Sequence, residues 1–362
     1  MMSPLVLSAW SAVSPYGVGA EPFARGITAG RCAVGPLDPA THPGPFDRGG
    51  VVPDFSARTH VGKKGTRTMD RVTALAVAAV GQLLESCDGG PVRQPEETAL
   101  VLGTGSGSVQ SIMDFTRDSF AGERPYHVDP ARFPNAVMNR AAGQSAIWHR
   151  IKGPNTTVAG GWLTGLLALS YAARLHRGGH CARVLCGAAE EYSEQRAWLE
   201  WHGRSAAERA TPLGEGGAVF LLEPAEAARE AGHPALARLL TTRFRAYGAE
   251  SEVRAALAAC VRDALKTTGV APGDVRLVAP LGAGGESAAL EEAGVGDALG
   301  AADPRWIRCR PLLGDTSAAA TSLQLAAVLA AAGADGLAPG EAALVTGVER
   351  DGTVGCALLA GA

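Results

Sequence analysis

Residues 153–165 (GPNTTVAGGWLTG) have the pattern that presents a nucleophile in many enzymes. The pattern predicts a short strand over residues 156–159, a glycine-rich corner, and a helix over residues 163–175 that is apolar on nearly every side. A side chain at such a corner lies beside the helix N-terminus, where unsatisfied N–H groups and the helix dipole favour negative charge. Enzymes use such corners to present a Ser or a Cys and to lower the pKa of a thiol. This corner carries Trp162, and an indole cannot act as a nucleophile.

The same segment resembles the active-site segment of the β-ketoacyl synthases, condensing enzymes of the thiolase fold. In that family the corner residue is a Cys that carries the acyl chain, and Trp162 stands at its position. Other motifs similar to family landmarks follow in the same order over nearly the whole chain, at residues 12–17 (AVSPYG), 70–71 (DR), 103–107 (GTGSG), 133–135 (FPN), 143–144 (GQ) and 214–217 (GEGG). Each motif alone is weak, and their shared order makes the resemblance specific.

A condensing enzyme of this family also needs two histidines, which polarise the thioester carbonyl and stabilise the enolate formed on decarboxylation. The resemblance places Leu281 at the first histidine position and Asp315 at the second. All eight histidines lie at or before residue 233, so no shift of register can supply either one. Arg310 replaces the usual lysine, and residues 348–352 (VERDG) replace the glycine- and Phe-rich gate loop. The resemblance therefore implies that this chain has no catalytic residues for condensation.

Within this family, a Cys-less homologue called the chain-length factor pairs with the active ketosynthase and shapes the tunnel that the two share. The resemblance implies that this chain is such a subunit, heterodimeric with an active ketosynthase and acting on polyketide or fatty-acyl chains held by an acyl carrier protein. Typical members carry Gln at the corner, so the Trp argues against a decarboxylase role. By the family's geometry the tunnel and dimer region includes residues 106–120 and 133–138. The candidates for gating the acyl chain in the tunnel are Met113, Phe115, Phe120, Met138 and Trp162.

Two other functions stay open at this stage: an acyltransferase or thioester-handling enzyme that reuses the fold, and a homodimeric protein that binds an acyl or aryl ligand. The residues do not predict a second catalytic site. Asp315 at a helix start favours an N-cap role, and Glu190 and Glu191 are expected to point to opposite faces of a strand. Residues 103–107 lack a P-loop lysine and the glycine spacing of a dinucleotide site. We therefore expect no cofactor and no metal.

A cluster of basic residues lies between residues 58 and 71. The simplest interpretation is a solvated face near a helix start. The alternative is a docking surface for the acidic carrier protein, with association steered by charge. The candidates for carrier docking are Arg58, Lys63, Lys64 and Arg67.

The composition is that of a globular protein, with 362 residues of which 46% are hydrophobic and 19% charged. A formal net charge of −3 gives no case for binding nucleic acid or a membrane surface, and no stretch approaches the roughly 20 apolar residues of a membrane span. The seven cysteines are scattered and mostly lie in apolar segments, and the N-terminus lacks the order of a signal peptide. We expect a cytoplasmic protein with reduced, buried thiols.

The elements that must position these residues alternate between strands and helices. Apolar runs that end or begin at glycine predict buried strands over residues 98–103, 182–187 and 217–223. The same order of elements repeats in the segments 234–241, 252–267, 275–280, 315–332, 342–347 and 353–360. The sequence therefore predicts an α/β fold with an N-terminal half over residues 1–233 and a C-terminal half over residues 234–362. The resemblance implies the thiolase-like, duplicated fold with five layers, α-β-α-β-α.

Overall fold

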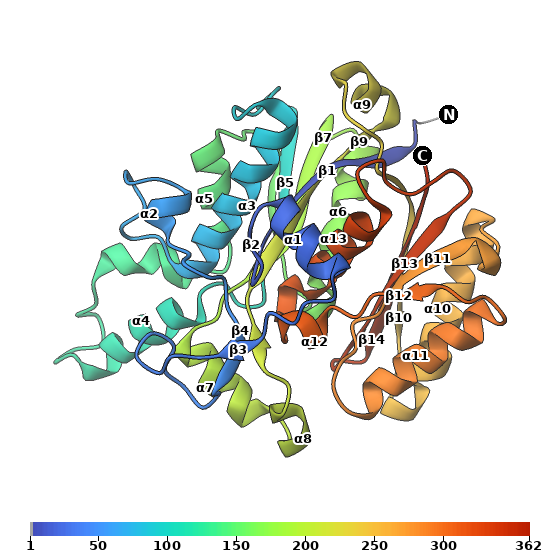
Figure 1. Cartoon of the computed structure of the whole chain (residues 1–362). Coiled ribbons are helices and arrows are strands. Elements are labelled where there is room, and N and C mark those ends of the chain that lie inside the picture. Colours follow the sequence, from blue (N-terminus) through green and yellow to red (C-terminus); the bar gives the residue numbers. More distant parts are fainter. Residues whose placement is uncertain (1–2) are drawn as a thin grey trace.

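The computed structural model describes residues 3–362, in which one mixed sheet of eleven strands runs through the molecule (Figure 1). Its strands in the first part of the chain are β1 (Leu5–Ser14), β2 (Gly17–Val18), β5 (Thr98–Gly103), β6 (Asn155–Val158), β7 (Arg183–Glu190) and β9 (Gly216–Pro224). Its strands in the second part are β10 (Ala237–Ala246), β11 (Val275–Ala279), β12 (Arg305–Trp306), β13 (Ala342–Glu349) and β14 (Thr353–Ala360).

The strand order of this sheet is symmetrical about the antiparallel pair of β1 and β10. Outward from β1 the strands are β9, β7, β5 and β6, and outward from β10 they are β14, β13, β11 and β12. The first two pairings on each side are antiparallel and the next two are parallel. The repeat of one unit that the sequence predicts is therefore visible in the sheet. The division at residues 233 and 234 stays a prediction.

Helices cover the sheet in layers. The helices α3 (Arg71–Asp88) and α5 (Arg140–His149) pack on the outer face of the first half of the sheet, and α10 (Val253–Thr268) and α11 (Glu286–Leu299) on that of the second. Between the two halves lie α6 (Thr164–Arg177) and α13 (Ala320–Ala332), whose buried residues share one core cluster with strands of both halves (Figure 1). The predicted layered α/β fold is confirmed.

Local capping signals fix the long helix of the first half. The side chain of Asp70 accepts a hydrogen bond from Thr73 N at 2.8 Å, and Gly89 ends α3 with a φ of 73°. β5 and β14 have their predicted bounds, whereas β7 runs past residue 187 to Glu190 because Ala188, Ala189 and Glu190 keep pairing with β9. The helix predicted over residues 315–332 begins only at Ala320, after a 3₁₀ turn, η5 (Ser317–Ala319).

Residues 35–66 contain some regular structure between irregular segments. The strands β3 (Gly35–Pro36) and β4 (Arg48–Gly50) pair with β8 (Leu213–Gly214) in a separate three-stranded sheet, and α2 (Ala57–His60) follows. Glycine makes the close approach possible, because a Cβ on Gly50 would collide with the carbonyl of Leu313. The segment is otherwise irregular.

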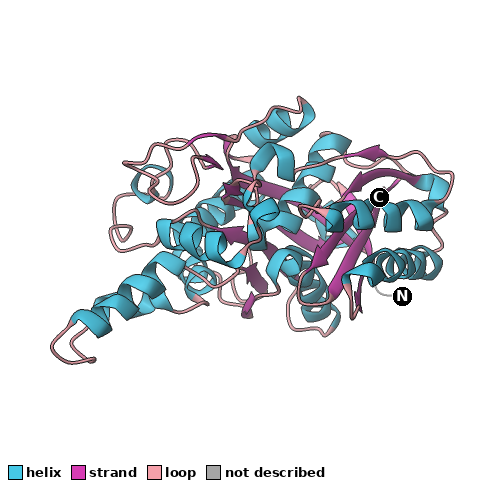
Figure 2. Cartoon of the chain, turned by 90° about the horizontal axis from the view of Figure 1, so that it is seen from below, coloured by secondary structure: helices cyan, strands magenta, loops and turns pink. Residues whose placement is uncertain are grey.

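The remaining helices are α1 (Ala20–Thr28), α4 (Val109–Ala121), α7 (Glu194–Gly203), α8 (Ala206–Arg209), α9 (Ala225–Ala231) and α12 (Arg310–Leu313). The remaining 3₁₀ turns are η1 (Pro130–Ala136), η2 (Gly161–Leu163), η3 (Glu250–Glu252) and η4 (Pro272–Asp274). α4 and the loop after it project from the body of the molecule (Figures 1 and 2). Within residues 3–362 no helix has the length and apolar character needed to cross a membrane.

Candidate functional site

Trp162 lies in η2, the turn that joins β6 to α6, and its side chain is buried, with 8% of the residue exposed. Its backbone N–H donates to a carboxylate oxygen of Glu349, which is the last residue of β13. Gly161 has a φ of +52°, and a Cβ at this position would collide with the same carboxylate. The corner predicted from the sequence is therefore present. Its backbone N–H already donates a hydrogen bond to a carboxylate of this chain.

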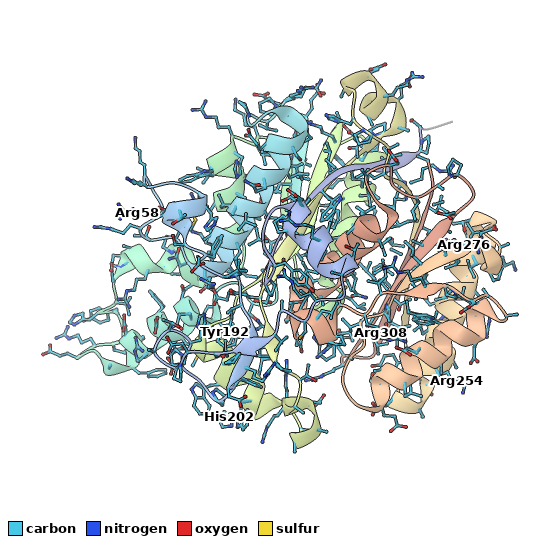
Figure 3. All side chains as sticks on the ribbon, in the orientation of Figure 1. Arg58, Tyr192, His202, Arg254, Arg276 and Arg308 are labelled. Atoms are coloured by element: carbon cyan, nitrogen blue, oxygen red, sulfur yellow. The ribbon has the colours of Figure 1, made fainter. Side chains whose placement is uncertain are left out.

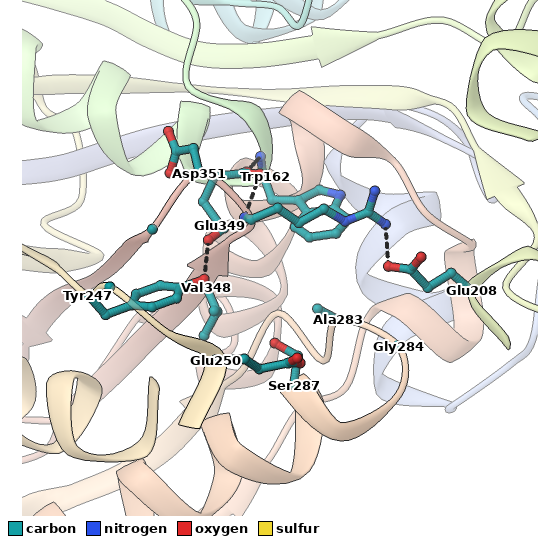
Figure 4. A pocket seen from close by; sticks show the side chains of 13 residues that line it. Trp162, Glu208, Tyr247, Glu250, Ala283, Gly284, Ser287, Val348, Glu349 and Asp351 are labelled. Carbon is teal, nitrogen blue, oxygen red and sulfur yellow. Dashed lines mark hydrogen bonds and ion pairs between the residues drawn. The ribbon is translucent and has the colours of Figure 1, made fainter. Parts of the chain in front are cut away.

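Two guanidinium groups lie over the indole of Trp162. The Cζ atom of Arg310 is 4.9 Å from the ring centroid, and that of Arg350 is 4.7 Å from it. Arg350 also forms an ion pair with Glu208 of α8, with 2.7 Å between Nη2 and Oε1 (Figure 4). Both ring distances are within the range of a cation–π interaction. The indole thus has two cation contacts in addition to its apolar packing.

Asp315 is the hydrogen-bond partner of the indole. Trp162 Nε1 donates to Asp315 Oδ1 at 3.0 Å, and Oδ2 accepts from Arg204 and Arg310, both at 2.5 Å. Burial by itself would raise the pKa of Asp315, but Arg310, Arg204 and Arg196 lower it to about 2. The group is therefore an ionised carboxylate at neutral pH, although only 1% of the residue is exposed.

The N-cap role predicted for Asp315 is wrong. The N-cap residue of α13 is Ala319, which makes no side-chain hydrogen bond. Asp315 does accept a hydrogen bond from Ser317 N at 2.9 Å, but its other acceptor positions serve the indole and two arginines. The physical reason is burial, because a carboxylate at this depth needs cations as well as one amide.

Leu281 packs against Trp162 in a small apolar cluster with Ala283 and Ala320. It is 2% exposed, and its backbone N–H donates to Glu291 Oε1 at 2.9 Å. The structure therefore brings together Trp162, Leu281 and Asp315, the three positions that sequence comparison singled out. An alkyl side chain offers no hydrogen-bond donor to a substrate.

The thiol of Cys309 lies beside this cluster. It lines a cavity of about 10 Å³ together with Leu281, Arg310 and Asp315, a volume close to the minimum that one water needs. Burial raises the pKa of Cys309 to about 12. The thiol stays protonated at neutral pH and is a poor nucleophile.

A larger pocket of about 420 Å³ lies outside the indole, which forms part of its wall (Figure 4). Its polar lining carries four carboxylates and one guanidinium, from Glu208, Glu250, Glu349, Asp351 and Arg350. Burial raises the pKa of Glu349. This pocket stops at the sealed corner and presents mainly acidic groups to an entering ligand.

Sequence reasoning missed the contribution of α7 and α8 to this site. Arg204, between these helices, is 111 residues from Asp315 in sequence, and Glu208 reaches Arg350 from α8. Arg196 of α7 also donates to the backbone oxygen of Asp315 at 3.1 Å. No local motif marks these residues, since the charges they neutralise come from distant parts of the chain.

The four tunnel candidates other than Trp162 lie on α4 or close after η1. Met113, Phe120 and Met138 are exposed by 51%, 85% and 42%, and the half-buried Phe115 has its ring 6.0 Å from that of Phe133. None of them lines the pocket beside Trp162. In residues 3–362 the exposed large apolar side chains all fall between positions 113 and 199, at Met113, Phe120, Tyr126, Phe133, Met138, Ile147, Trp198 and Leu199. Their role in gating a tunnel stays a prediction.

The carrier-docking candidates lie on α2 and in the loop after it. Arg58, Lys63, Lys64 and Arg67 are largely exposed, and none forms an ion pair within the described chain. Figure 3 places Arg58 at the edge of the molecule, on the opposite side from Arg276. Their positive charge is therefore available to a partner, and their docking role stays a prediction.

The remaining polar motifs have structural partners. Glu190 accepts a hydrogen bond from Gly105 N at 3.1 Å, so a carboxylate occupies the glycine-rich loop that the sequence brought into consideration for phosphate binding. Glu191 instead accepts from Val72 N at 3.1 Å and from the hydroxyl of Ser108 at 3.2 Å. Burial, with Asp70 and Glu190 nearby, raises the pKa of Glu191 to about 7. Within the part of the chain that the structure describes, no group of three His, Cys, Asp or Glu side chains is arranged to hold a metal ion.

Comparison with known proteins gives three findings. The model of the β-ketoacyl synthase N-terminal domain matches residues 2–228. The 3-oxoacyl-[acyl-carrier-protein] synthase 2 of Synechocystis is 26% identical over 252 residues, and the match spans 63% of this chain and 59% of that protein. The structure of the ishigamide ketosynthase/chain length factor is 42% identical, with a TM-score of 0.89, and the match covers 98% of this chain and 99% of that one.

One further structure shows the fold alone. It is a type II polyketide synthase ketosynthase bound to a hexaketide and in complex with its acyl carrier protein, with a TM-score of 0.81 at 16% identity. The match covers 100% of both chains. The layered architecture is thus the thiolase-like one.

Proposed function

The chain belongs to the β-ketoacyl synthase family, and we propose that it acts there as a non-catalytic, chain-length-factor-like subunit. It would pair with an active ketosynthase and shape the acyl tunnel in which a polyketide or fatty-acyl chain grows on a carrier protein. The observation that carries the proposal is the sealed corner, where a buried, hydrogen-bonded Trp162 occupies the place of a nucleophile.

The chemistry of the corner argues against condensation. A condensing enzyme needs a thiolate, and Trp162 offers only an indole N–H that already donates to Asp315. Asp315 is an anion, so it would oppose the negative charge that develops on an enolate or an oxyanion. Leu281 cannot polarise a carbonyl, and the thiol of Cys309 is buried and protonated.

The surface of the first half supports pairing with another chain. Among residues 3–362, β6 is the last strand of the sheet and pairs only with β5, so one row of its backbone groups faces outward. The exposed apolar side chains lie on α4, on the segment around η1, and on α5 and α7. An edge strand beside such a surface fits a partner of the same fold, which would extend the sheet and cover the apolar residues.

A paired subunit also gives the tunnel candidates a role. Met113, Phe115, Phe120 and Met138 lie on the surface that a partner would cover, so they would line a space between the two chains rather than a cavity of this chain alone. The exposed cluster of Arg58, Lys63, Lys64 and Arg67 would attract an acidic carrier protein. Both assignments rest on the pairing.

The test is co-expression with an active ketosynthase encoded beside this chain. We expect the two chains to co-purify as a heterodimer, and we expect Phe120→Asp to weaken the complex at least tenfold. Arg276→Asp, at an exposed position on the far side of the molecule, serves as the matched control (Figure 3). A stable homodimer that ignores the ketosynthase would favour a homodimeric acyl-binding protein. Turnover of an acyl thioester by the isolated chain would favour an acyltransferase or thioester-handling enzyme.

The tunnel assignment has its own test in the assembled complex. Phe115→Ala and Met113→Ala should lengthen the products, because a smaller side chain leaves room for a longer acyl chain. Ile147→Ala, which also shortens an exposed apolar side chain, should leave product length unchanged. Product masses that stay the same for all four tunnel candidates would remove the gating role without affecting the pairing.

A further inference from the structure

Two cysteines of the second half lie in contact inside the core. Cys260 on α10 and Cys356 on β14 are separated by 96 residues in sequence, and their Sγ atoms are 3.8 Å apart. The residues are 2% and 0% exposed. In residues 3–362 no other two sulfur atoms approach within hydrogen-bonding distance, and all seven thiols are free. The two side chains thus come from different layers and meet at one point.

The surroundings shift the pKa values of the two thiols in opposite directions. The sulfur of Cys356 lies 3.8 Å from Cys260 Sγ and 3.9 Å from the Cys260 carbonyl oxygen, so its S–H can donate a hydrogen bond to either atom. This hydrogen bond lowers the pKa of Cys260, and Arg245 and Arg243 of β10 act in the same direction against burial. The same hydrogen bond and burial raise the pKa of Cys356. Cys260 is therefore suited to be the attacking thiolate and Cys356 the second thiol.

The cysteines elsewhere in the core lack this activation. Burial raises the pKa of the half-buried Cys87 and of the buried Cys186 and Cys309 to about 12, and it also raises the pKa of the buried Cys181. Cys32 is exposed, and its sulfur contacts only backbone carbonyls, those of Val34 and Pro311. The pair on α10 and β14 is thus distinguished from them by a second sulfur within reach.

We propose that Cys260 and Cys356 form a reversible disulfide when the protein meets hydrogen peroxide. The Cys260 thiolate attacks one peroxide oxygen, the O–O bond breaks, and hydroxide leaves and takes up a proton as water. The sulfur of Cys356 then attacks the sulfenic acid on Cys260, the S–S bond forms, and a second water leaves with the oxygen and the Cys356 proton. The sum is two thiols and one peroxide giving one disulfide and two waters, and an external dithiol reverses it.

The position of this bond gives it a structural consequence. It would tie the outer helix α10 to β14, the strand that follows β13, which ends at Glu349, and the turn that carries Arg350. It would also close a loop of 96 residues, which restricts the unfolded chain more than the folded one. Oxidation should therefore stabilise the second half and the wall of the pocket beside Trp162. Because both sulfurs are buried, the bond should form only as α10 opens locally.

The test uses the full chain, reduced and then treated with hydrogen peroxide. We expect the number of free thiols titrated in denaturant to fall from seven to five, and a peptide map to link Cys260 with Cys356. The Tm should rise by several degrees, and dithiothreitol should reverse the rise. Cys260→Ser and Cys356→Ser should each abolish the link, and Cys32→Ser should retain it. Seven thiols after treatment, or a link that uses any other cysteine, would overturn the proposal. The peptide map of the unsubstituted protein decides this even if a serine variant fails to fold.

Discussion

Trp162 and Asp315 stand at corresponding corners of the two halves. Trp162 lies within the 3₁₀ turn η2 and Asp315 stands two residues before the 3₁₀ turn η5, and each turn runs into one of the two central helices. The corners meet: the indole of Trp162 donates to Asp315, and the hydroxyl of Thr321 on α13 donates to the backbone oxygen of Trp162 at 3.0 Å. They differ in what they bury, because one holds an aromatic ring and the other a charge.

This difference separates two ways in which the fold fills a buried corner. The aromatic corner is filled by a packed ring over which Arg310 and Arg350 lie, whereas the carboxylate of the charged corner depends on Arg204 and Arg310 for neutralisation. A buried ring is stabilised by packing, and a buried carboxylate is stabilised only while its partners remain. The two corners should therefore respond differently to substitution, pH and a restored thiol.

The largest effect is expected from Asp315→Ala. Removal of the carboxylate leaves Arg310, at 9% side-chain exposure, without its anion, and leaves Arg204, at 1%, paired only with Glu200 in the described chain. Breaking a buried pair on one side costs about 3–5 kcal/mol, and urea unfolding measures it. Asp351→Ala, at an exposed position of the neighbouring pocket, is the control and should change the free energy of unfolding by less than about 0.5 kcal/mol. A loss below about 1 kcal/mol for Asp315→Ala would remove the distinction between the corners.

Glu191 is a buried carboxylate that forms no ion pair in the described chain. The dependence of stability on pH that it causes should be opposite to that caused by Asp315. The pKa of Glu191 is raised from 4.5 to about 7, so the folded state binds more protons than the unfolded state between these values. Stability should then fall as pH rises through this window, by at most about 3 kcal/mol. The pKa of Asp315 is lowered from 3.8 to about 2, so its stabilisation is present above pH 3.8 and is lost only on acidification toward pH 2.

Unfolding curves of the protein and of Glu191→Gln, measured from about pH 4.5 to about pH 7.5, test this effect. The amide introduced by the substitution does not ionise. The free energy of unfolding of the protein minus that of the variant should therefore fall as pH rises through the window. The comparison uses slopes, because the amide also changes the hydrogen bond from Val72 N by a constant amount. Parallel curves would show that Glu191 does not titrate in this window.

A smaller effect is expected at the aromatic corner from Arg350→Ala. Arg350 lies over the indole much as Arg310 does, but its side chain is 41% exposed. An exposed cation–π contact and ion pair together contribute about 1 kcal/mol or less. Thermal or urea unfolding should therefore show a change well below that of Asp315→Ala. A loss of equal size would mean that Arg350, rather than packing, fixes the ring.

No gain of activity is expected from Trp162→Cys. The variant restores a thiol at the corner, but Leu281 and Asp315 still stand where donors are needed. Acylation of the new thiol by a reactive thioester is expected and is measured by intact mass, whereas condensation with a malonyl thioester is not. Product formation by this variant would show that the thiol alone was missing.

The fold was accessible from the sequence because its signals are local. Glycine-closed apolar runs identify β5 and β14, and Asp70 and Gly89 delimit α3. The order of short motifs then identified Trp162 and Leu281 as positions to compare. What a carboxylate does inside a protein depends on residues far away in sequence, so Asp315 was misinterpreted as a helix cap. The partners of Asp315 could not be predicted, since no spacing links them to it.

An assay of the purified chain alone, with malonyl-carrier protein and an acyl primer, tests whether the corner at Trp162 is closed to condensation. Carbon dioxide release and chain extension should stay at the level of the buffer control, and should appear only when an active ketosynthase is added. Turnover by the isolated chain that persists through repeated purification, and that is lost when Trp162 is substituted, would contradict the central claim that its own corner is sealed against this chemistry.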